Sequence, residues 1–260
     1  MKKIITFLLL SFMTISLYSQ GKVILTHTLK MYNGIEISLE VENKPNDNFY
    51  FIKIDTLTLT DDKGQILTKN LVKNIFRRAN VLARYEIDEK KKYKYFHIKG
   101  VIKYFKPSEN KNSYFNLGKI KNLEKNINLI DKSITIKNPN LFFSIVDSAT
   151  FEKVFPNFKY RTNDRDEYKK IDLGSYDLIY AYRTDKKQDF ITAVNEEFEP
   201  GFNNLTLNDN KTGINYKLIK LKKGMTASEK EEIKIELMIE NKNSITLIPF
   251  EFKNIEPKAL

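Results

Sequence analysis

The chain has 260 residues, and its composition excludes several classes of site before any motif is considered. It contains no cysteine, which rules out disulfides, thiolate metal sites and a thiol nucleophile. The two histidines, His27 and His97, are too few for a multi-histidine catalytic metal site. The 44 basic and 33 acidic side chains give a formal charge of +11, which raises the question of an anionic partner.

The first twenty residues differ from the rest of the chain. Lys2 and Lys3 precede a mostly apolar run, and a small residue, Ser19, lies just before Gly21. This layout predicts a secretory signal peptide over 1–20, with an uncleaved N-terminal anchor as the alternative. We therefore expect an exported protein of the bacterial cell envelope: periplasmic, on the outer surface or secreted. The absence of cysteine excludes a lipoprotein.

Apolar residues recur mainly with a period of two. They alternate with polar residues over 35–42 and again over 233–240, which is typical of half-buried antiparallel strands. Turn sequences such as Asn33-Gly34 and Asp61-Asp62-Lys63-Gly64 separate the strand candidates. The pattern predicts an all-β fold. Further strands are expected at Phe49 to Leu59, Tyr93 to Phe105, Ser133 to Ile136, Leu178 to Arg183, Phe190 to Val194 and Tyr216 to Leu221.

Short blocks of sequence recur in the same order. Leu57 to Lys63 is similar to Leu205 to Lys211, and Glu-Asn-Lys-Asn-Ser occurs at both 109–113 and 240–244. A third pair, 121–124 and 253–256, follows each copy. The order predicts two tandem immunoglobulin-like antiparallel β-sandwich domains. The alternative is one continuous sheet assembly with coincidental Lys/Asn-rich turns.

The repeat divides the mature chain into residues 21–126 and 127–260. The first segment holds 21 basic and 12 acidic side chains, whereas the second holds 21 of each. The sequence therefore predicts a basic β-sandwich domain followed by a neutral one.

The first copy contains an insertion in which the apolar period changes. Apolar residues from Val72 to Ala83 follow a helical spacing, which predicts an amphipathic helix over about 70–85 with Asn70 as its N-cap. Its polar side and the following segment carry a set of cations. These candidate polyanion contacts are Lys73, Arg77, Arg78, Arg84, Lys90, Lys91, Lys92 and Lys94.

A cationic face of this kind suits an anionic glycan or the head groups of lipids. The alternative is a helix that caps the sandwich with an ordinary solvated face. Tyrosines interleaved with lysines between Tyr85 and Tyr114 also suit sugar stacking, although strand aromatics more often fill a core. Nucleic acid is not expected as a partner of an exported protein that lacks a recognised binding motif.

Catalytic motifs are weak. Ser108 and Lys111 match S-x-x-K, and Lys211-Thr212-Gly213 matches K-T-G, but both lie in expected turns and lack the buried helix that this chemistry needs. Carboxylate groups provide the remaining enzymatic hypothesis, a carbohydrate-active hydrolase with an acid/base pair between the domains. They are also the oxygen ligands of a calcium site. The carboxylates concerned are Asp164, Asp166, Glu167, Glu196, Glu197 and Glu199.

From these observations we expect a non-catalytic binding or structural protein. No catalytic, metal-binding or cofactor-binding residue is predicted. The leading hypothesis is that the basic first domain contacts a polyanionic glycan or lipid surface. A further hypothesis is that the protein is a subunit of an envelope assembly and binds an envelope protein through an exposed sheet edge.

Overall fold

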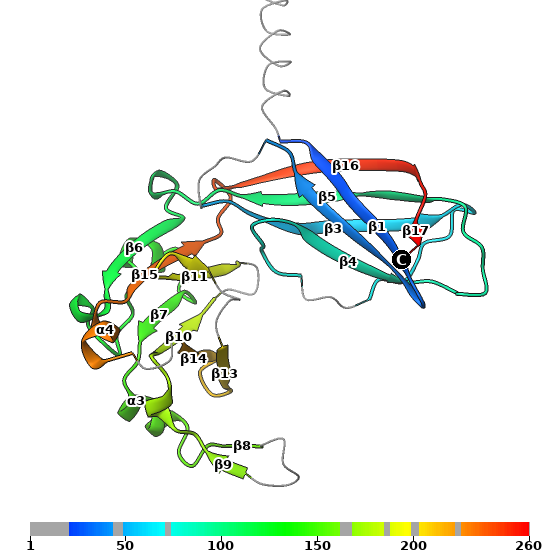
Figure 1. Ribbon diagram of the computed structural model, residues 1–260. Helices are drawn as coiled ribbons and strands as arrows, with labels where there is room; N and C mark the ends of the chain where they lie inside the picture. The colour runs from blue at the N-terminus through cyan, green and yellow to red at the C-terminus, as the bar shows by residue number, and fades with distance from the viewer. Residues whose placement is uncertain are drawn as a thin grey trace, which may run out of the picture. The chain divides into compact units, whose positions relative to one another are not determined.

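The structure is a computed structural model that describes residues 21–43, 49–70, 74–161, 168–184, 188–198, 203–221 and 225–259. These residues form a mostly β structure of several antiparallel sheets, with only short helices (Figure 1). The predicted signal segment, 1–20, lies outside the described residues. Within the described residues, no helix is long and apolar enough to cross a membrane.

The chain divides into two compact units. Unit 1 is formed by Met1–Pro107 together with Lys242–Leu260, and unit 2 is formed by Ser108–Asn241. Unit 2 is thus inserted into the sequence of unit 1. This differs from the predicted tandem arrangement, in which the first domain ends at residue 126 and the second runs from there to the C-terminus.

The recurring sequence blocks, on which the tandem prediction is based, have the same structure in only some of their pairs. The blocks at 57–63 and 205–211 both form the end of a strand and a turn, with Gly64 and Gly213 at positive φ. The later blocks do not correspond in structure, because 121–124 includes the end of a 3-10 helix whereas 253–255 belongs to a strand. The similarity between 57–63 and 205–211 thus corresponds to two related turns.

Unit 1 contains two sheets with their strands in the orders β17-β1-β2-β4 and β16-β5-β3. All neighbouring pairs are antiparallel except β1 and β17. The first sheet consists of β1 Val23–Met31, β2 Gly34–Val41, β4 Val81–Glu86 and β17 Lys258–Ala259. The second consists of β3 Phe51–Asp61, β5 Phe96–Phe105 and β16 Ile245–Ile255.

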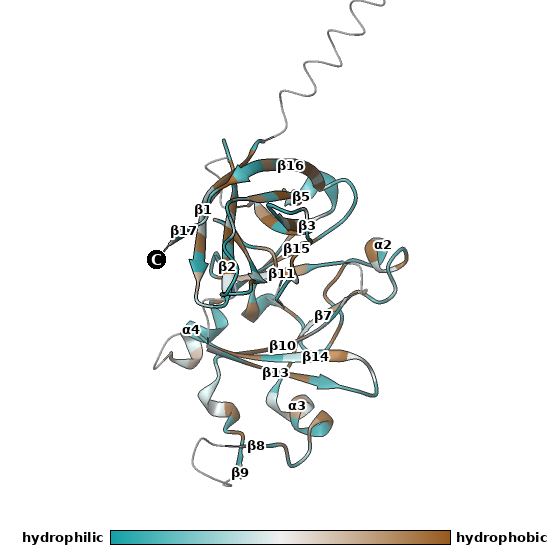
Figure 2. Cartoon of the chain, turned by 90° about the vertical axis from the view of Figure 1, so that its right-hand side faces the viewer, coloured by the Kyte–Doolittle hydropathy of each residue, from teal (hydrophilic) through white to brown (hydrophobic). Residues whose placement is uncertain are grey.

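Apolar side chains from both sheets form one core in unit 1. Ile35, Ile37 and Leu39 of β2 are fully buried, as are Ile98 and Ile102 of β5. Hydrophilic and hydrophobic residues alternate along these strands, as the period of two predicts (Figure 2).

One hydrogen bond joins the two sheets inside this core. Tyr85 of β4 is 1% exposed, and its hydroxyl donates to the carbonyl of Leu57 of β3 over 3.0 Å. Burial raises the pKa of Tyr85 to about 12. The hydroxyl is therefore protonated at neutral pH and can donate a hydrogen bond to the carbonyl.

The helix predicted over about 70–85 is wrong for the described part of this range. Residues 81–86 form β4, and Arg77 forms a bridge with Ile52 of β3. Residues 71–73 lie outside the described residues. The spacing that suggested a helix also leaves Val81, Ala83 and Tyr85 on one face of a strand, and pairing with β2 decides between the two.

Unit 2 contains two sheets of four strands each, together with a small β8-β9 hairpin. One sheet has the order β13-β14-β10-β7, with β13 Asn203–Asp209, β14 Ile214–Lys220, β10 Leu178–Arg183 and β7 Phe142–Ile145. The other has the order β12-β11-β15-β6, with β12 Glu197–Phe198, β11 Phe190–Val194, β15 Lys234–Ile239 and β6 Tyr114–Lys119. The hairpin consists of β8 Lys159–Arg161 and β9 Tyr168–Lys170.

Three short α-helices and three 3-10 helices complete the described elements. They are α2 Lys132–Thr135, α3 Ser148–Val154, α4 Ala227–Glu231, η1 Glu109–Lys111, η2 Ile120–Asn122 and η3 Leu173–Ser175. The strand predicted at Ser133 to Ile136 is wrong, because residues 133–135 belong to the helix α2. Asp131 caps that helix by accepting a hydrogen bond from the Ser133 N–H.

The hydrogen bond between the sheets of unit 1 makes a stability prediction. We expect Tyr85→Phe to lower the free energy of unfolding by about 1 to 2 kcal/mol, because the half-buried Leu57 carbonyl loses the hydrogen bond from the buried Tyr85 hydroxyl. Urea unfolding followed by circular dichroism measures this change. The control is Tyr32→Phe, since Tyr32 is 82% exposed and its hydroxyl is expected to contribute nothing. An equal effect of both substitutions would contradict the prediction.

Candidate functional site

The predicted cationic residues do not share a helical face. Arg77 is exposed beside Ile52, and Arg78 follows it in the connection between β3 and β4. Arg84 of β4 forms an ion pair with Glu36 of β2, with 2.7 Å between Nε and Oε2. The Arg84 guanidinium group is thus already paired with a carboxylate of the protein itself. Lys73 lies outside the described residues.

The other four candidates, Lys90, Lys91, Lys92 and Lys94, are exposed in the loop between β4 and β5. Because Asp61 pairs with Phe96, this loop lies at the end of β3 opposite Ile52 and Arg77. Nine residues of an extended strand span about 30 Å. The structure therefore brings the four lysines together, but it separates them from Arg77 and Arg78.

The charge asymmetry predicted from the sequence remains after the units are redrawn. Residues 21–107 and 242–260 of unit 1 hold 20 basic and 12 acidic side chains, whereas unit 2 holds 22 and 21. Residues 21–260 thus carry nearly all of their excess positive charge in unit 1.

The candidate catalytic groups do not form a site among the described residues. Asp164, Asp166, Glu167 and Glu199 lie outside those residues, and Glu196 and Glu197 are exposed beside the turn from β11 to β12. His27 lies on β1 and His97 on β5. Over the described ranges, no three carboxylate, histidine or cysteine groups are placed to hold a metal ion. The K-T-G segment is a turn, as expected, whereas Lys111 of the S-x-x-K segment lies in the 3-10 helix η1.

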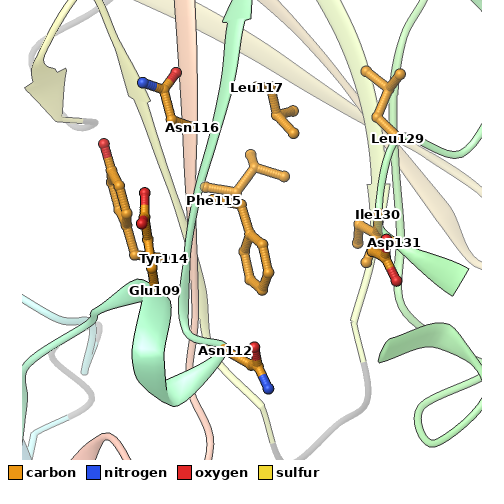
Figure 3. Close-up of a pocket in the computed structure, with 10 residues that line it drawn as sticks. Glu109, Asn112, Tyr114, Phe115, Asn116, Leu117, Leu129, Ile130 and Asp131 are labelled. Atoms are coloured by element: carbon orange, nitrogen blue, oxygen red, sulfur yellow. The ribbon is translucent and has the colours of Figure 1, made fainter. Parts of the chain in front are cut away.

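A groove in unit 2 runs along the strand β6. It has a volume of about 380 Å³. Figure 3 shows Phe115 and Leu117 of β6 on the side of the strand that faces Leu129 and Ile130. The residues that line the groove are Glu109, Asn112, Tyr114, Phe115, Asn116, Leu117, Leu129, Ile130, Asp131 and Leu237.

The groove lies where the two sheets of unit 2 present their edges. β6 ends the sheet order β12-β11-β15-β6. Opposite it, the segment 126–130 follows β7, because the N–H groups of Asn126 and Leu129 donate to the carbonyls of Ile145 and Phe143. Phe115, Leu117 and Leu129 are half-buried and pack against the core of unit 2. The groove thus opens onto that core.

Several other strand edges are covered by additional segments. The N–H of Leu67 donates to Leu59 of β3, and the N–H of Asn70 donates to Arg84 of β4. Leu129 covers β7 in the same way. At the edge of its sheet, β16 contains Pro249, which lacks an N–H. Proteins protect strand edges by such means because the unpaired N–H and C=O groups of an edge strand can pair with another chain.

The pairing of β6 with β15 fixes which backbone groups face the groove. Ile239 donates to the Ser113 carbonyl and Ile120 donates to the Ile233 carbonyl, with a register shift between the two ends. In an antiparallel ladder the hydrogen-bonded positions alternate. The N–H and C=O groups of Asn116 and Lys119 are therefore directed away from β15, toward the open edge.

The two faces of β6 differ in chemistry. Phe115 and Leu117 present apolar side chains to the core side, whereas Tyr114, Asn116 and the neighbouring Glu109 lie on the other side (Figure 3). The lining contains the carboxylates of Glu109 and Asp131 and neither lysine nor arginine.

A buried carboxylate lies behind the polar side of the groove. Glu236 of β15 is 8% exposed, and its Oε1 accepts a hydrogen bond from the Tyr114 hydroxyl. Within the described part of the chain, the buried Oε2 of Glu236 has no hydrogen-bond partner. Burial raises the pKa of Tyr114, and so do the hydrogen bond to Glu236 and the charges of Glu236, Glu109 and Glu196.

An ion-pair cluster holds the far end of β6. Lys119 of β6 and Lys121 of η2 both donate to the carboxylate of Glu232, which follows α4. These two hydrogen bonds lower the pKa of Glu232 to about 2. The Lys119 ammonium group is thus engaged within the protein.

No family model matches the chain, and no curated protein matches it. The assignment of a site therefore depends on the geometry alone. Sequence reasoning missed this groove, although the alternation of Tyr114, Phe115, Asn116 and Leu117 is the signal of a strand with two different faces.

The ion-pair cluster makes a pH prediction. The pKa of Glu232 is 4.5 in the unfolded chain, and in the folded chain it is about 2. Its contribution to stability is therefore complete above pH 4.5 and is lost as the pH falls toward 2. We expect Glu232→Gln to lower the urea midpoint at pH 7, by an amount that shrinks as the pH falls through this range.

The control is Glu231→Gln, an exposed neighbour in α4, which is expected to leave the urea midpoint unchanged throughout. A difference between Glu232→Gln and the wild type that does not depend on pH would contradict the role given to this carboxylate.

Proposed function

We propose that this chain is a non-catalytic, exported protein of the bacterial cell envelope that binds an extended segment of a partner protein along β6. The observation that carries the proposal is the edge strand β6, bordered by an apolar groove of about 380 Å³ that opens onto the core of unit 2. A strand added to β6 pairs with its outward backbone groups and places alternate side chains in the groove.

Two further features support strand addition. The half-buried Phe115, Leu117 and Leu129 supply apolar surface that a partner can remove from water. In addition, β6 is held at both ends, by the Ile120 pairing with Ile233 and by the Ser113 pairing with Ile239. A strand that is already fixed loses little conformational entropy when a partner pairs with it.

The proposed fold of unit 1 is an immunoglobulin-like domain. Its strands follow in chain order as β1, β2, β3, β4, β5 and β16, and they pair as β1-β2-β4 and β16-β5-β3. Immunoglobulin domains pair the strands A, B and E in one sheet and C, F and G in the other, which is the same order. Unit 2 then occupies the connection between the F and G strands.

The proposed export depends on the sequence of residues 1–20. Their positive start, apolar run and small residue before Gly21 are typical of a signal peptide. The lack of cysteine fits an envelope protein whose stability comes from its hydrophobic cores.

A selection from a library of random peptides tests strand addition for a partner of any sequence. We expect wild-type protein to enrich peptides in which every second residue is apolar. Asn116→Pro removes the outward N–H of β6, so it is expected to weaken the binding of the selected peptides at least about tenfold. Asn116→Ala keeps this N–H and is the matched control, and fluorescence anisotropy measures each affinity.

Enrichment of peptides that lack the alternation would overturn strand addition at β6. Equal binding to wild type and Asn116→Pro would do so too. Circular dichroism of both variants establishes that the fold is intact before affinities are compared.

A second candidate function is supported by the loop between β4 and β5. Four exposed lysines, Lys90, Lys91, Lys92 and Lys94, lie in seven residues that contain two carboxylates, Asp88 and Glu89. We propose that this loop associates with anionic lipid head groups or an anionic glycan through long-range attraction.

A quadruple Lys→Gln variant at 90, 91, 92 and 94 tests this second function. We expect wild-type protein to sediment with vesicles that contain phosphatidylglycerol and to bind dextran sulfate, less so as salt is raised. The variant is expected to lose most of this binding. The control removes four exposed lysines of unit 2, namely Lys137, Lys153, Lys159 and Lys211. If both variants lose the same amount of binding, the effect comes from the net charge of the protein and not from this loop.

A further inference from the structure

The two faces of β6 specify the chemistry of the strand that pairs with it. In an antiparallel pair, side chains directly opposite one another lie on the same face of the sheet. Residues opposite Phe115 and Leu117 therefore enter the apolar side of the groove. Residues opposite Tyr114 and Asn116 lie on the side that carries Glu109 (Figure 3).

The side of the groove that carries Glu109 has two carboxylates close to it. Glu109 is exposed, and Glu236, buried behind Tyr114, has one carboxylate oxygen without a hydrogen-bond partner among the described residues. A buried carboxylate that is only partly hydrogen-bonded is costly, and a nearby positive charge relieves that cost.

Three lysines close to the groove in sequence or on β6 are not among its lining residues. Lys119 donates to Glu232, and Lys111 and Lys132 flank Glu109 and Asp131 in sequence without lining the groove. The negative side of the groove thus has no lysine or arginine among its lining residues.

We infer that the partner strand alternates apolar and cationic side chains, with its lysine or arginine residues received by Glu109 in front of Glu236. This inference rests on the proposed strand addition and adds the class of partner. A strand with carboxylates at the same positions is rejected, because it would meet Glu109 and Glu236 with like charge.

The length of β6 sets the length of the recognised segment. β6 spans six residues, Tyr114–Lys119, so a partner segment of about six residues covers it. Asp131 lines the groove on the apolar side, where its Oδ1 accepts the hydrogen bond from the Ser133 N–H that caps α2.

Three synthetic peptides test the inference. Each has valine at alternate positions, and the intervening residues are lysine, serine or glutamate. Against full-length wild-type protein, we expect the lysine peptide to bind at least about tenfold tighter than the serine peptide, and the glutamate peptide to bind most weakly. The preference for lysine is expected to shrink as salt is raised. Isothermal titration calorimetry measures the affinities.

Substitutions locate this preference. Glu109→Gln and Glu236→Gln are each expected to reduce the ratio of the affinity for the lysine peptide to the affinity for the serine peptide. Glu152→Gln, an exposed position in α3, is the control. Because Glu109 is exposed, its substitution keeps the test decisive even if the buried Glu236 variant fails to fold.

The outcomes separate the inference from the proposed function. If all three peptides bind equally and lose affinity with Asn116→Pro, strand addition stands and the cationic preference is overturned. If no peptide binds, both fail. If the lysine peptide is preferred equally by the wild type and by Glu109→Gln, the assignment of the cation to this side of the groove is overturned.

Discussion

The pairing of β5 with β16 is the interaction on which the rest of the structure depends. Phe105 pairs with Ile245, and the ladder continues to Phe96 and Ile255. The whole of unit 2 lies in the sequence between these two strands. Closing so long a connection costs entropy that grows only slowly with its length. A long ladder and the buried Ile98, Ile102 and Ile248 therefore suffice to hold unit 1 together around an inserted unit.

The same constraint explains how far the sequence predicts the fold. Strands such as β2, β10 and β11 follow from the local pattern of apolar residues, and the structure places them where the pattern does. The order of domains does not follow, because it depends on β16 pairing with a strand far away in sequence. The segment 81–86 is a strand for a similar reason: its neighbour β2 decides between two patterns that its own residues allow.

The candidate site was harder to predict than the fold. Charged residues are visible in a sequence, and they led to the lysines of 90–94, which the structure does gather in one loop. The edge of β6 is visible only when its pairing with β15, and the absence of a described strand beyond it in the sheet order, are known. Glu236 illustrates the difficulty, since its strand reads as a simple alternation and its role depends on Tyr114, distant in sequence.

The central claim is that a partner pairs with the outward side of β6. The most direct measurement is amide hydrogen exchange, read by nuclear magnetic resonance, with and without a peptide recovered from the random library. The account predicts new protection at the Asn116 and Lys119 amides, whereas the Phe115 amide, already directed toward β15, changes little. Protection confined to the 90–94 loop or to unit 1, with Asn116 and Lys119 unchanged in the bound state, would contradict it.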